Sequence, residues 1–261
     1  MQRLKQVLKW MGGVLALLLV LLVSVGFYFH KPRPSGQAGP EADALARQVE
    51  QAVQREAWDR THAITWVFGG RNTHLWDRTR NLHRVSWQKG EQRVEVLQDL
   101  SAPEQGVVTL GGVPVPSDDA GSYLQKGYAT WINDAFWLNP LVKLFDEGTV
   151  RELLPPVDGQ QRLMLRYQSG GLTPGDAYLY TLDQNLIPVA WEMWVSIIPV
   201  GGIRVTWEGW QTLHTGAKVS TVHAMPMREL LLTDVRSADS AAELNGDVDP
   251  FAAWLEQRTK P

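Results

Sequence analysis

The segment PVAWEMWVSIIPVGGIRVTWEGW, residues 188–210, contains two apolar runs separated by a turn sequence. In the second run, Ile203, Val205 and Trp207 alternate with polar residues, which is the period of two expected of a β-strand with one buried face. The first run has apolar residues on one face in the same alternation: Trp191, Met193, Val195 and Ile197. The segment therefore predicts an antiparallel hairpin whose two strands share an apolar face.

The register of this hairpin is restricted by the same alternation. Both apolar faces stay on one side only when the numbers of paired residues add to an even total, because a one-residue slip turns every side chain over. Pairing Ile197 with Ile203 would set Glu192 opposite Glu208, and like charges disfavour this arrangement. Pairing Ile197 with Val205 removes the clash and is the register that we predict, with a shorter turn.

The N-terminal part of the chain contains a second apolar segment. Residues 11–29, MGGVLALLLVLLVSVGFYF, carry no charge and are long enough to cross ~30 Å of hydrocarbon as a helix. Basic side chains are slightly more frequent before the run than after it. We therefore expect residues 1–30 to be a cytoplasmic stub and a single transmembrane anchor in a bacterial inner membrane, with the rest in the periplasm. A cleaved signal peptide is the alternative, since Ser24, Val25 and Gly26 offer small residues for cleavage.

The segment after this run is rich in proline and glycine. Residues 31–40 are predicted to form an extended or flexible tether that holds the domain off the membrane. Residues 41–55 follow as an amphipathic helix with acidic residues in its first turn. Its apolar stripe consists of Leu45, Val49, Ala52 and Val53.

The rest of the chain alternates between short apolar runs and turn residues, which predicts antiparallel strands. We expect strands at residues 64–68, 74–77, 82–87, 93–97, 162–167, 178–182, 219–224 and 228–232, beside the hairpin. Residues 101–122 are expected to be mostly loop with a short strand at 107–110. Residues 128–145 are expected to be helical in two pieces, interrupted near Asn139 and Pro140, and residues 249–257 a closing helix. The predicted fold is α+β: residues 41–261 form a single domain with a strongly curved antiparallel sheet, a half-open barrel, and helices over its concave side.

Composition excludes several classes of function. The net charge is -3 and the basic residues are scattered, so nothing indicates a nucleic-acid partner. The chain has no cysteine, and its six histidines show no metal-ligand spacing, so we expect no metal and no cofactor. Only His74 and His83 are placed to meet across neighbouring strands.

Carboxylates do not form a recognisable catalytic motif either. Asp134 lies among aromatic residues and Asp176 lies in a Thr-Pro-Gly-Asp turn, where capping and turn roles are usual. An enzyme would need two or more of Asp134, Asp176, Glu192 and the histidines to converge in one cleft. Without a nucleophile, metal or cofactor motif, we expect no catalytic residues and no enzymatic activity.

Twelve tryptophans are an unusual number for this length. A buried indole N–H needs a hydrogen-bond partner, so dense tryptophan packing is an awkward way to fill a core. The alternative is a cavity for an apolar ligand. The candidate lining residues lie on the apolar strand faces: Trp66, Phe68, Trp87, Trp191, Met193 and Trp207.

Three short segments support a family resemblance. They are WDR at residues 76–78, WINDAFWL at 131–138 and SGGLTPGDAY at 169–178. Together with the order of predicted elements, they resemble the periplasmic lipoprotein-carrier superfamily with the LolA/LolB-like fold. The resemblance implies a half-open antiparallel barrel with helices as a lid over a hydrophobic cavity for acyl chains. This chain departs from that pattern, because the soluble carrier has no membrane anchor and the outer-membrane acceptor is held by an acylated cysteine.

The sequence thus favours a membrane-anchored periplasmic protein that binds a lipid, an acyl chain or a lipidated protein in a tryptophan-lined cavity. The alternative is an envelope scaffold or assembly module with a filled core and a protein partner. The presence or absence of a cavity beneath the tryptophans separates the two hypotheses.

Overall fold

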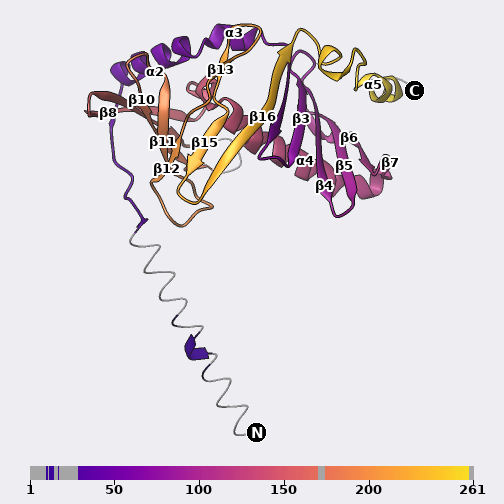
Figure 1. Ribbon diagram of the computed structural model, residues 1–261, viewed down its shortest axis with the longest axis horizontal. Helices are drawn as coiled ribbons and strands as arrows, with labels where there is room; N and C mark the ends of the chain where they lie inside the picture. The colour runs from indigo at the N-terminus through magenta and orange to yellow at the C-terminus, as the bar shows by residue number, and fades with distance from the viewer. Residues whose placement is uncertain (1–9, 11, 15–16, 18–28, 170–173, 259–261) are drawn as a thin grey trace.

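The computed structural model describes residues 10, 12–14, 17, 29–169 and 174–258 (Figure 1). Within these residues, no helix is both long and apolar enough to cross a membrane. The predicted span at residues 11–29 lies almost entirely outside the described residues, so the anchor stays a prediction.

Two large antiparallel sheets make up the domain. The eight-stranded sheet has the order β15-β16-β2-β3-β4-β5-β6-β7, and the six-stranded sheet has the order β1-β8-β9-β10-β11-β12. The strands of the first sheet are β2 (Ala63–Phe68), β3 (Asn72–Asp77), β4 (Leu82–Lys89), β5 (Gln92–Asp99), β6 (Ala102–Leu110), β7 (Val113–Pro114), β15 (Val222–Met225) and β16 (Arg228–Ala238). Those of the second are β1 (Gln37–Ala38), β8 (Thr149–Val157), β9 (Gln160–Tyr167), β10 (Ala177–Leu182), β11 (Pro188–Trp194) and β12 (Ile203–Thr206). A small ribbon of β13 (Gln211–Thr212) and β14 (Lys218–Val219) connects them.

The two sheets meet edge to edge at β12 and β15. An antiparallel bridge joins Glu208 to Val222. The backbone N–H of Ala224 also donates to the Thr206 hydroxyl at 3.0 Å. The antiparallel strands therefore continue from one sheet into the other across this seam, and neither strand order closes on itself among the described residues.

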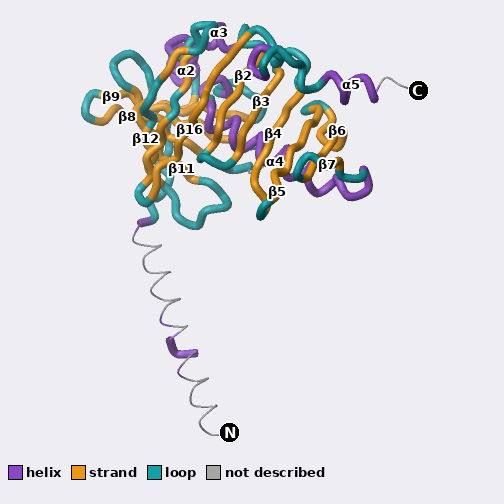
Figure 2. Tube along the Cα trace, turned by 45° about the vertical axis from the view of Figure 1, so that its right-hand side comes forward, coloured by secondary structure: helices purple, strands orange, loops and turns teal. Residues whose placement is uncertain are grey.

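Helices cover both faces of the larger sheet, since Leu75 packs in a core with Phe251 and Trp254, whereas its neighbour Trp76 packs in a core with Trp131. The helices are α2 (Pro40–Ala52), α3 (Arg55–Asp59), α4 (Ser117–Leu138), the short 3-10 helix η1 (Pro140–Lys143), the 3-10 turn η2 (Glu243–Asn245) and α5 (Ala252–Arg258). Figure 2 shows α4 running behind the strands of the eight-stranded sheet. The helix stops at Asn139 before Pro140, where η1 begins, as the sequence predicts. The α+β class and the antiparallel arrangement are confirmed.

The hairpin at residues 188–210 is confirmed, but its register is wrong in our prediction. Trp191 pairs with Val205, and Met193 pairs with Ile203. The parity argument holds, since both pairs add to an even number. However, residues 195–202 form a loop rather than strand and turn, and Ile197 is 78% exposed. The observed register sets Glu192 opposite Arg204, which is a better charge arrangement than either register that we considered.

Two other predictions are wrong in part. Residues 101–122 are not mostly loop, because β6, β7 and the first turns of α4 occupy most of them. Proline, glycine and aspartate interrupt the apolar alternation of this segment, so the sequence pattern does not indicate the strands. We also missed β8, whose Pro155 and Pro156 reduce the strand signal and coincide with an irregular register against β9.

The proline- and glycine-rich segment is extended but not free. Gln37 pairs with Leu153 at the edge of the six-stranded sheet. At the other end, the Lys31 N–H donates to the Gly201 carbonyl at 3.0 Å. The expectation of a free tether is therefore corrected: both ends of residues 31–38 are bound to the domain.

Candidate functional site

The six predicted lining residues lie in three neighbouring hydrophobic clusters. Trp191, Met193 and Trp207 belong to the core of the six-stranded sheet. Trp66 is buried with Phe68 against it in the core around β2, and Trp87 lies in the core around β4 to β6. The structure thus places them on connected apolar faces and does not gather them around one hollow.

Helix α4 joins the three clusters. Its first turns pack on β5 and β6, its middle reaches β3, and its last turn reaches β2 and the six-stranded sheet. The buried stripe has the three- and four-residue spacing of one helix face: Ala120, Leu124, Gly127, Asp134 and Leu138, with Trp131 half-buried on it. Helix α4 therefore contributes side chains to each of the three clusters that contain the predicted lining residues.

At Gly127, helix α4 lies tightly against the sheet. A β-carbon placed there would come within 2.5 Å of the Gln98 side-chain oxygen and 3.0 Å of a Val96 methyl group. Glycine at this position lets the helix backbone lie directly on β5.

The largest concentration of aromatic rings lies under the last turn of α4. We call it the aromatic cluster, and its members are Phe136, Trp137, Tyr167, Tyr178, Tyr180, Trp191, Trp207, Trp210 and His223. The Trp191 ring is central: its centroid lies 4.7 Å from that of Tyr178 and 5.0 Å from that of Trp137. These separations and tilted planes are those of favourable aromatic pairs. Rings of α4 thus pack directly on rings of the sheet.

Several buried polar atoms of this region have no hydrogen-bond partner among the described residues. Within the aromatic cluster they are the Tyr167 and Tyr180 hydroxyls, the Trp191 and Trp207 indole nitrogens and Nε2 of His223. Beside it, the same holds for Trp66, Trp76, Trp87 and Trp131. Buried polar groups are almost always paired in native proteins. This concentration of unpaired donors marks the inner face beneath α4 as different from an ordinary hydrophobic core.

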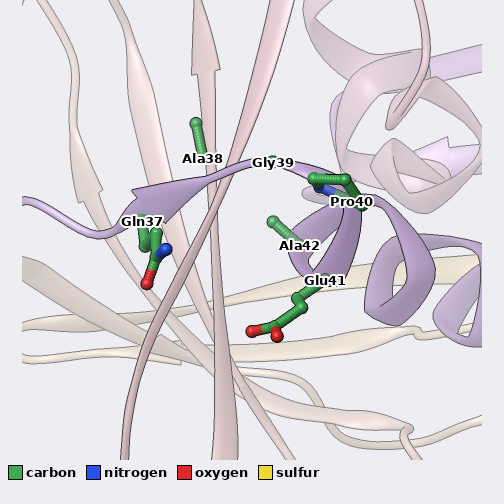
Figure 3. Close-up of a pocket in the computed structure, with 6 residues that line it drawn as sticks. All are labelled: Gln37, Ala38, Gly39, Pro40, Glu41 and Ala42. Carbon is green, nitrogen blue, oxygen red and sulfur yellow. The ribbon is translucent and has the colours of Figure 1, made fainter.

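Neither of the two best-formed hollows in the described part of the chain lies between these rings. One of about 230 Å³ lies at residues 37–42 (Figure 3), and one of about 340 Å³ lies beside His62, Arg80 and Asp239. Neither is lined by a predicted ligand-binding residue.

A buried polar group connects the middle of α4 to β3 and β4. Nε2 of His74 lies 2.8 Å from Oδ2 of Asp134, and Nδ1 of His74 lies 3.0 Å from Nε2 of His83. Asn72 and Asn133 each donate to the Asp134 carboxylate at 2.8 Å. The predicted meeting of His74 and His83 is confirmed, and Asp134 joins them from the helix.

Burial determines the protonation of this group. Desolvation lowers the pKa of His74, although the Asp134 carboxylate opposes the shift. Desolvation also holds the pKa of His83 well below its usual range, and the neighbouring His74 and Arg84 add to this effect. Both rings are thus neutral at neutral pH. If His74 donates to Asp134, its other nitrogen accepts from His83, and Nδ1 of His83 remains as an unpaired acceptor.

The other candidate carboxylates lie apart from this group. Asp176 is buried and accepts the Ser196 N–H at 2.9 Å. Glu192 is bound by Lys31 at 2.6 Å. Asp134 and two histidines do converge, but they lie in the core and no described cleft reaches them. Among the described residues, no group of His, Cys, Asp and Glu is arranged to hold a metal ion.

Sequence reasoning missed the contribution of α4. Phe136 and Trp137 face the sheet from the helix, yet only strand residues were proposed as lining. The apolar spacing from Ala120 to Leu138 is that of one helix face, but the helix that we predicted began only at residue 128 and omitted its first part. In the quoted WDR segment, the Arg78 guanidinium lies 4.6 Å from the Trp58 ring and 5.2 Å from the Trp76 ring. It therefore attaches α3 to β3.

Comparisons with known proteins give distant matches. No family model matches the sequence, and no curated protein matches it. A crystal structure of a DUF1329 family protein from Desulfovibrio piger is similar with a TM-score of 0.35 and 10% identity, over 74% of this chain and 92% of that one. A domain from Vibrio parahaemolyticus, assigned to the outer membrane lipoprotein-sorting proteins, is similar with a TM-score of 0.33 and 12% identity, over 74% and 93%.

Proposed function

We propose that this protein binds an apolar ligand, such as a lipid, an acyl chain or a lipidated protein, between helix α4 and the aromatic faces of its sheets. In this proposal residues 1–30 anchor the protein in the inner membrane and the domain lies in the periplasm. The proposal includes no catalytic activity. The observation that carries it is the ring-on-ring contact between α4 and the sheet, which is rich in unpaired buried donors.

The packing under α4 suits a sheet surface on which an apolar ligand can replace the aromatic rings of α4. Phe136 and Trp137 are only half-buried, whereas Trp191 is completely buried beneath them. Moving the end of α4 outward would expose a continuous aromatic surface, and the unpaired hydroxyl and indole groups could then pair with the polar end of a ligand. An acyl chain contributes ~0.8 kcal/mol for each buried CH₂ group, so about ten such groups would compensate for moving two aromatic rings off the sheet.

The first experiment asks whether the full chain, extracted from membranes, carries a lipid. Native mass spectrometry should show a bound lipid, and a fluorescent fatty acid should bind and be displaced by unlabelled fatty acid. If no lipid co-purifies and no fatty acid binds, the proposal is wrong.

Truncating a helix-side ring tests the role of α4. If the Trp137 ring competes with the ligand, Trp137→Ala should increase fatty-acid affinity, by about tenfold for each 1.4 kcal/mol of closed-state packing removed. The matched control is Trp254→Ala, which removes an indole from the separate core around α5 and should leave the affinity unchanged.

An envelope scaffold with a filled core is the second candidate. It is favoured by the close ring contacts between α4 and the sheet and by the two described hollows, neither of which is lined by a predicted ligand-binding residue. In that case Trp137→Ala lowers the stability, and neither the variant nor the native protein binds fatty acid.

A further inference from the structure

Two hairpin ends lie next to each other at one edge of the domain. The first is the loop between β11 and β12, residues 195–202, and the second is the turn between β15 and β16. The antiparallel contacts Glu208 to Val222 and Thr206 to Ala224 place β12 and β15 side by side. Figures 1 and 2 show both hairpin ends at the lower edge of the domain.

Large apolar side chains project from both ends. Ile197 is 78% exposed on the first hairpin, and Met227 is 97% exposed on the second. Such residues are common singly on a surface, but two on adjacent tips form one apolar edge. Arg204 and Arg228 lie near them and are exposed, as is Glu229.

The apolar edge is continuous with the interior. Val195, Ile198, Ile203 and Met225 are half-buried and pack against the core that contains Trp191 and Trp207. A path of apolar side chains therefore leads from the two tips to the aromatic cluster.

The chain immediately after the predicted anchor is fixed to the first hairpin. Nδ1 of His30 accepts the Gly201 N–H at 3.0 Å, and the Lys31 N–H donates to the Gly201 carbonyl at 3.0 Å. The Trp194 indole donates to the Lys31 carbonyl at 2.7 Å, and the Lys31 ammonium binds Glu192 at 2.6 Å.

Glycine is needed at the hairpin for this contact. A β-carbon on Gly201 would lie 2.3 Å from the Trp194 ring, and one on Gly202 would lie 2.6 Å from Cβ of Lys31. The loop is therefore shaped to receive residues 30–31.

This attachment limits how far the hairpin can be from a membrane. The apolar run ends at Phe29, and two residues extend at most ~7 Å. The headgroup layer on each side of the ~30 Å hydrocarbon core is roughly 5–7 Å thick. If residues 11–29 span the bilayer, the loop that carries Ile197 must lie within or against the headgroup layer. The tether that we expected to hold the domain away from the membrane cannot do so.

We propose that the β11–β12 and β15–β16 hairpin ends form a bilayer-contacting surface, with Ile197 and Met227 seated among the lipid headgroups, and that the apolar ligand passes from the bilayer to the aromatic cluster along this edge. The partner is a phospholipid bilayer with anionic headgroups, which suits the exposed Arg204 and Arg228. The passage of ligand rests on the apolar-ligand binding of the proposed function, whereas the contact with the bilayer rests only on its membrane anchor at residues 11–29.

Site-specific labelling tests the surface directly, because the chain has no cysteine. Ile197→Cys and Met227→Cys are made in the full chain, labelled with an environment-sensitive fluorophore and reconstituted in phosphatidylethanolamine–phosphatidylglycerol vesicles. We expect blue-shifted emission that is quenched by acyl-brominated lipid and protected from aqueous iodide. Val248→Cys, at a position that is 63% exposed near α5, should behave oppositely. Equal iodide quenching at all three positions would overturn the proposal.

Charge substitution tests the route. The double variant Ile197→Asp with Met227→Asp should slow fatty-acid uptake from vesicles at least fivefold while leaving binding of the same probe in detergent unchanged; Val248→Asp should alter neither. Native uptake by the double variant overturns the route. If the native protein itself binds no fatty acid, the route fails together with the proposed function, and the labels alone decide the bilayer contact.

Discussion

A disulfide bond between α4 and the sheet would test most directly whether α4 must move away from the sheet for a ligand to bind. A β-carbon placed on Gly127 would lie 3.4 Å from Cβ of Val96 on β5. Disulfides have Cβ separations of about 3.5–4.5 Å, so Gly127→Cys with Val96→Cys needs only a small adjustment. The new side chain would meet Oε1 of Gln98, which accepts no hydrogen bond among the described residues. Turning this carboxamide aside affects only the long hydrogen bonds from its Nε2 to the Pro103 and Leu124 carbonyls, at 3.3 and 3.5 Å.

The expected stabilisation follows from the loop that the bond closes. A loop of about 30 residues corresponds to about 3.7 kcal/mol of lost unfolded-chain entropy, an upper value when the bond strains the fold. Urea unfolding of the oxidised and reduced forms measures this difference and shows whether the helix lies where the structure has it. No gain on oxidation, with the bond verified by mass, would contradict the packing at Gly127.

The functional expectation is separate from the stability. If a ligand binds beneath α4, the oxidised form should bind fluorescent fatty acid at least tenfold more weakly than the native protein, and reduction should restore binding. Each single cysteine variant controls for the substitutions themselves. Native affinity in the oxidised form would refute the idea that α4 leaves this part of the sheet.

Three further outcomes are expected. Asp134→Ala should lower the free energy of unfolding by about 2–4 kcal/mol, because a buried carboxylate that accepts from His74 is lost; Asp146→Ala, which breaks an exposed pair with Lys143, should cost at most ~0.5 kcal/mol. Burial lowers the pKa of His223 from 6.5 to about 4, so the unfolded chain takes up a proton first as the pH falls. Stability should be level above pH ~6.5 and decrease toward pH ~4, by up to ~1.4 kcal/mol per pH unit for this group. His223→Phe should reduce that slope in urea titrations, and His214→Asn, at a more exposed histidine, should not. Gly201→Ala should speed amide exchange at Lys31, which donates to the displaced carbonyl, while Gly121→Ala, facing open space on α4, should leave it unchanged.

The regular alternation of apolar residues was sufficient to predict most strands. Residues 64–97 form the expected meander β2 to β5, and Leu45, Val49 and Val53 are buried as the helical stripe requires. The parity of the hairpin was also predictable, because it depends only on which residues face inward. These features are local, and local patterns determine them.

The features that the sequence did not reveal depend on distant partners. The register of β11 against β12 is compatible with Glu192 opposite Arg204, and residues 195–202 are held by His30 and Lys31 from far along the chain. Asp134 was interpreted as a capping residue because Asn and Asp just before a helical run usually cap it. Its partners His74 and Asn72 are contributed by β3. Their spacing from Asp134 in the sequence does not predict these contacts.

The pairing of β2 with β16 has a consequence for the order of folding. Phe68 lies opposite Leu232, and Ala63 lies opposite Ala238, so strands from the two ends of the domain are neighbours in the middle of the larger sheet. During synthesis, β2 therefore stays an open edge until nearly the whole domain has emerged. Contacts of such long range slow folding and leave a transient strand edge exposed. Nascent chains that stop before β16 should be prone to aggregation and depend on chaperones, whereas loss of α5 alone leaves this pairing intact.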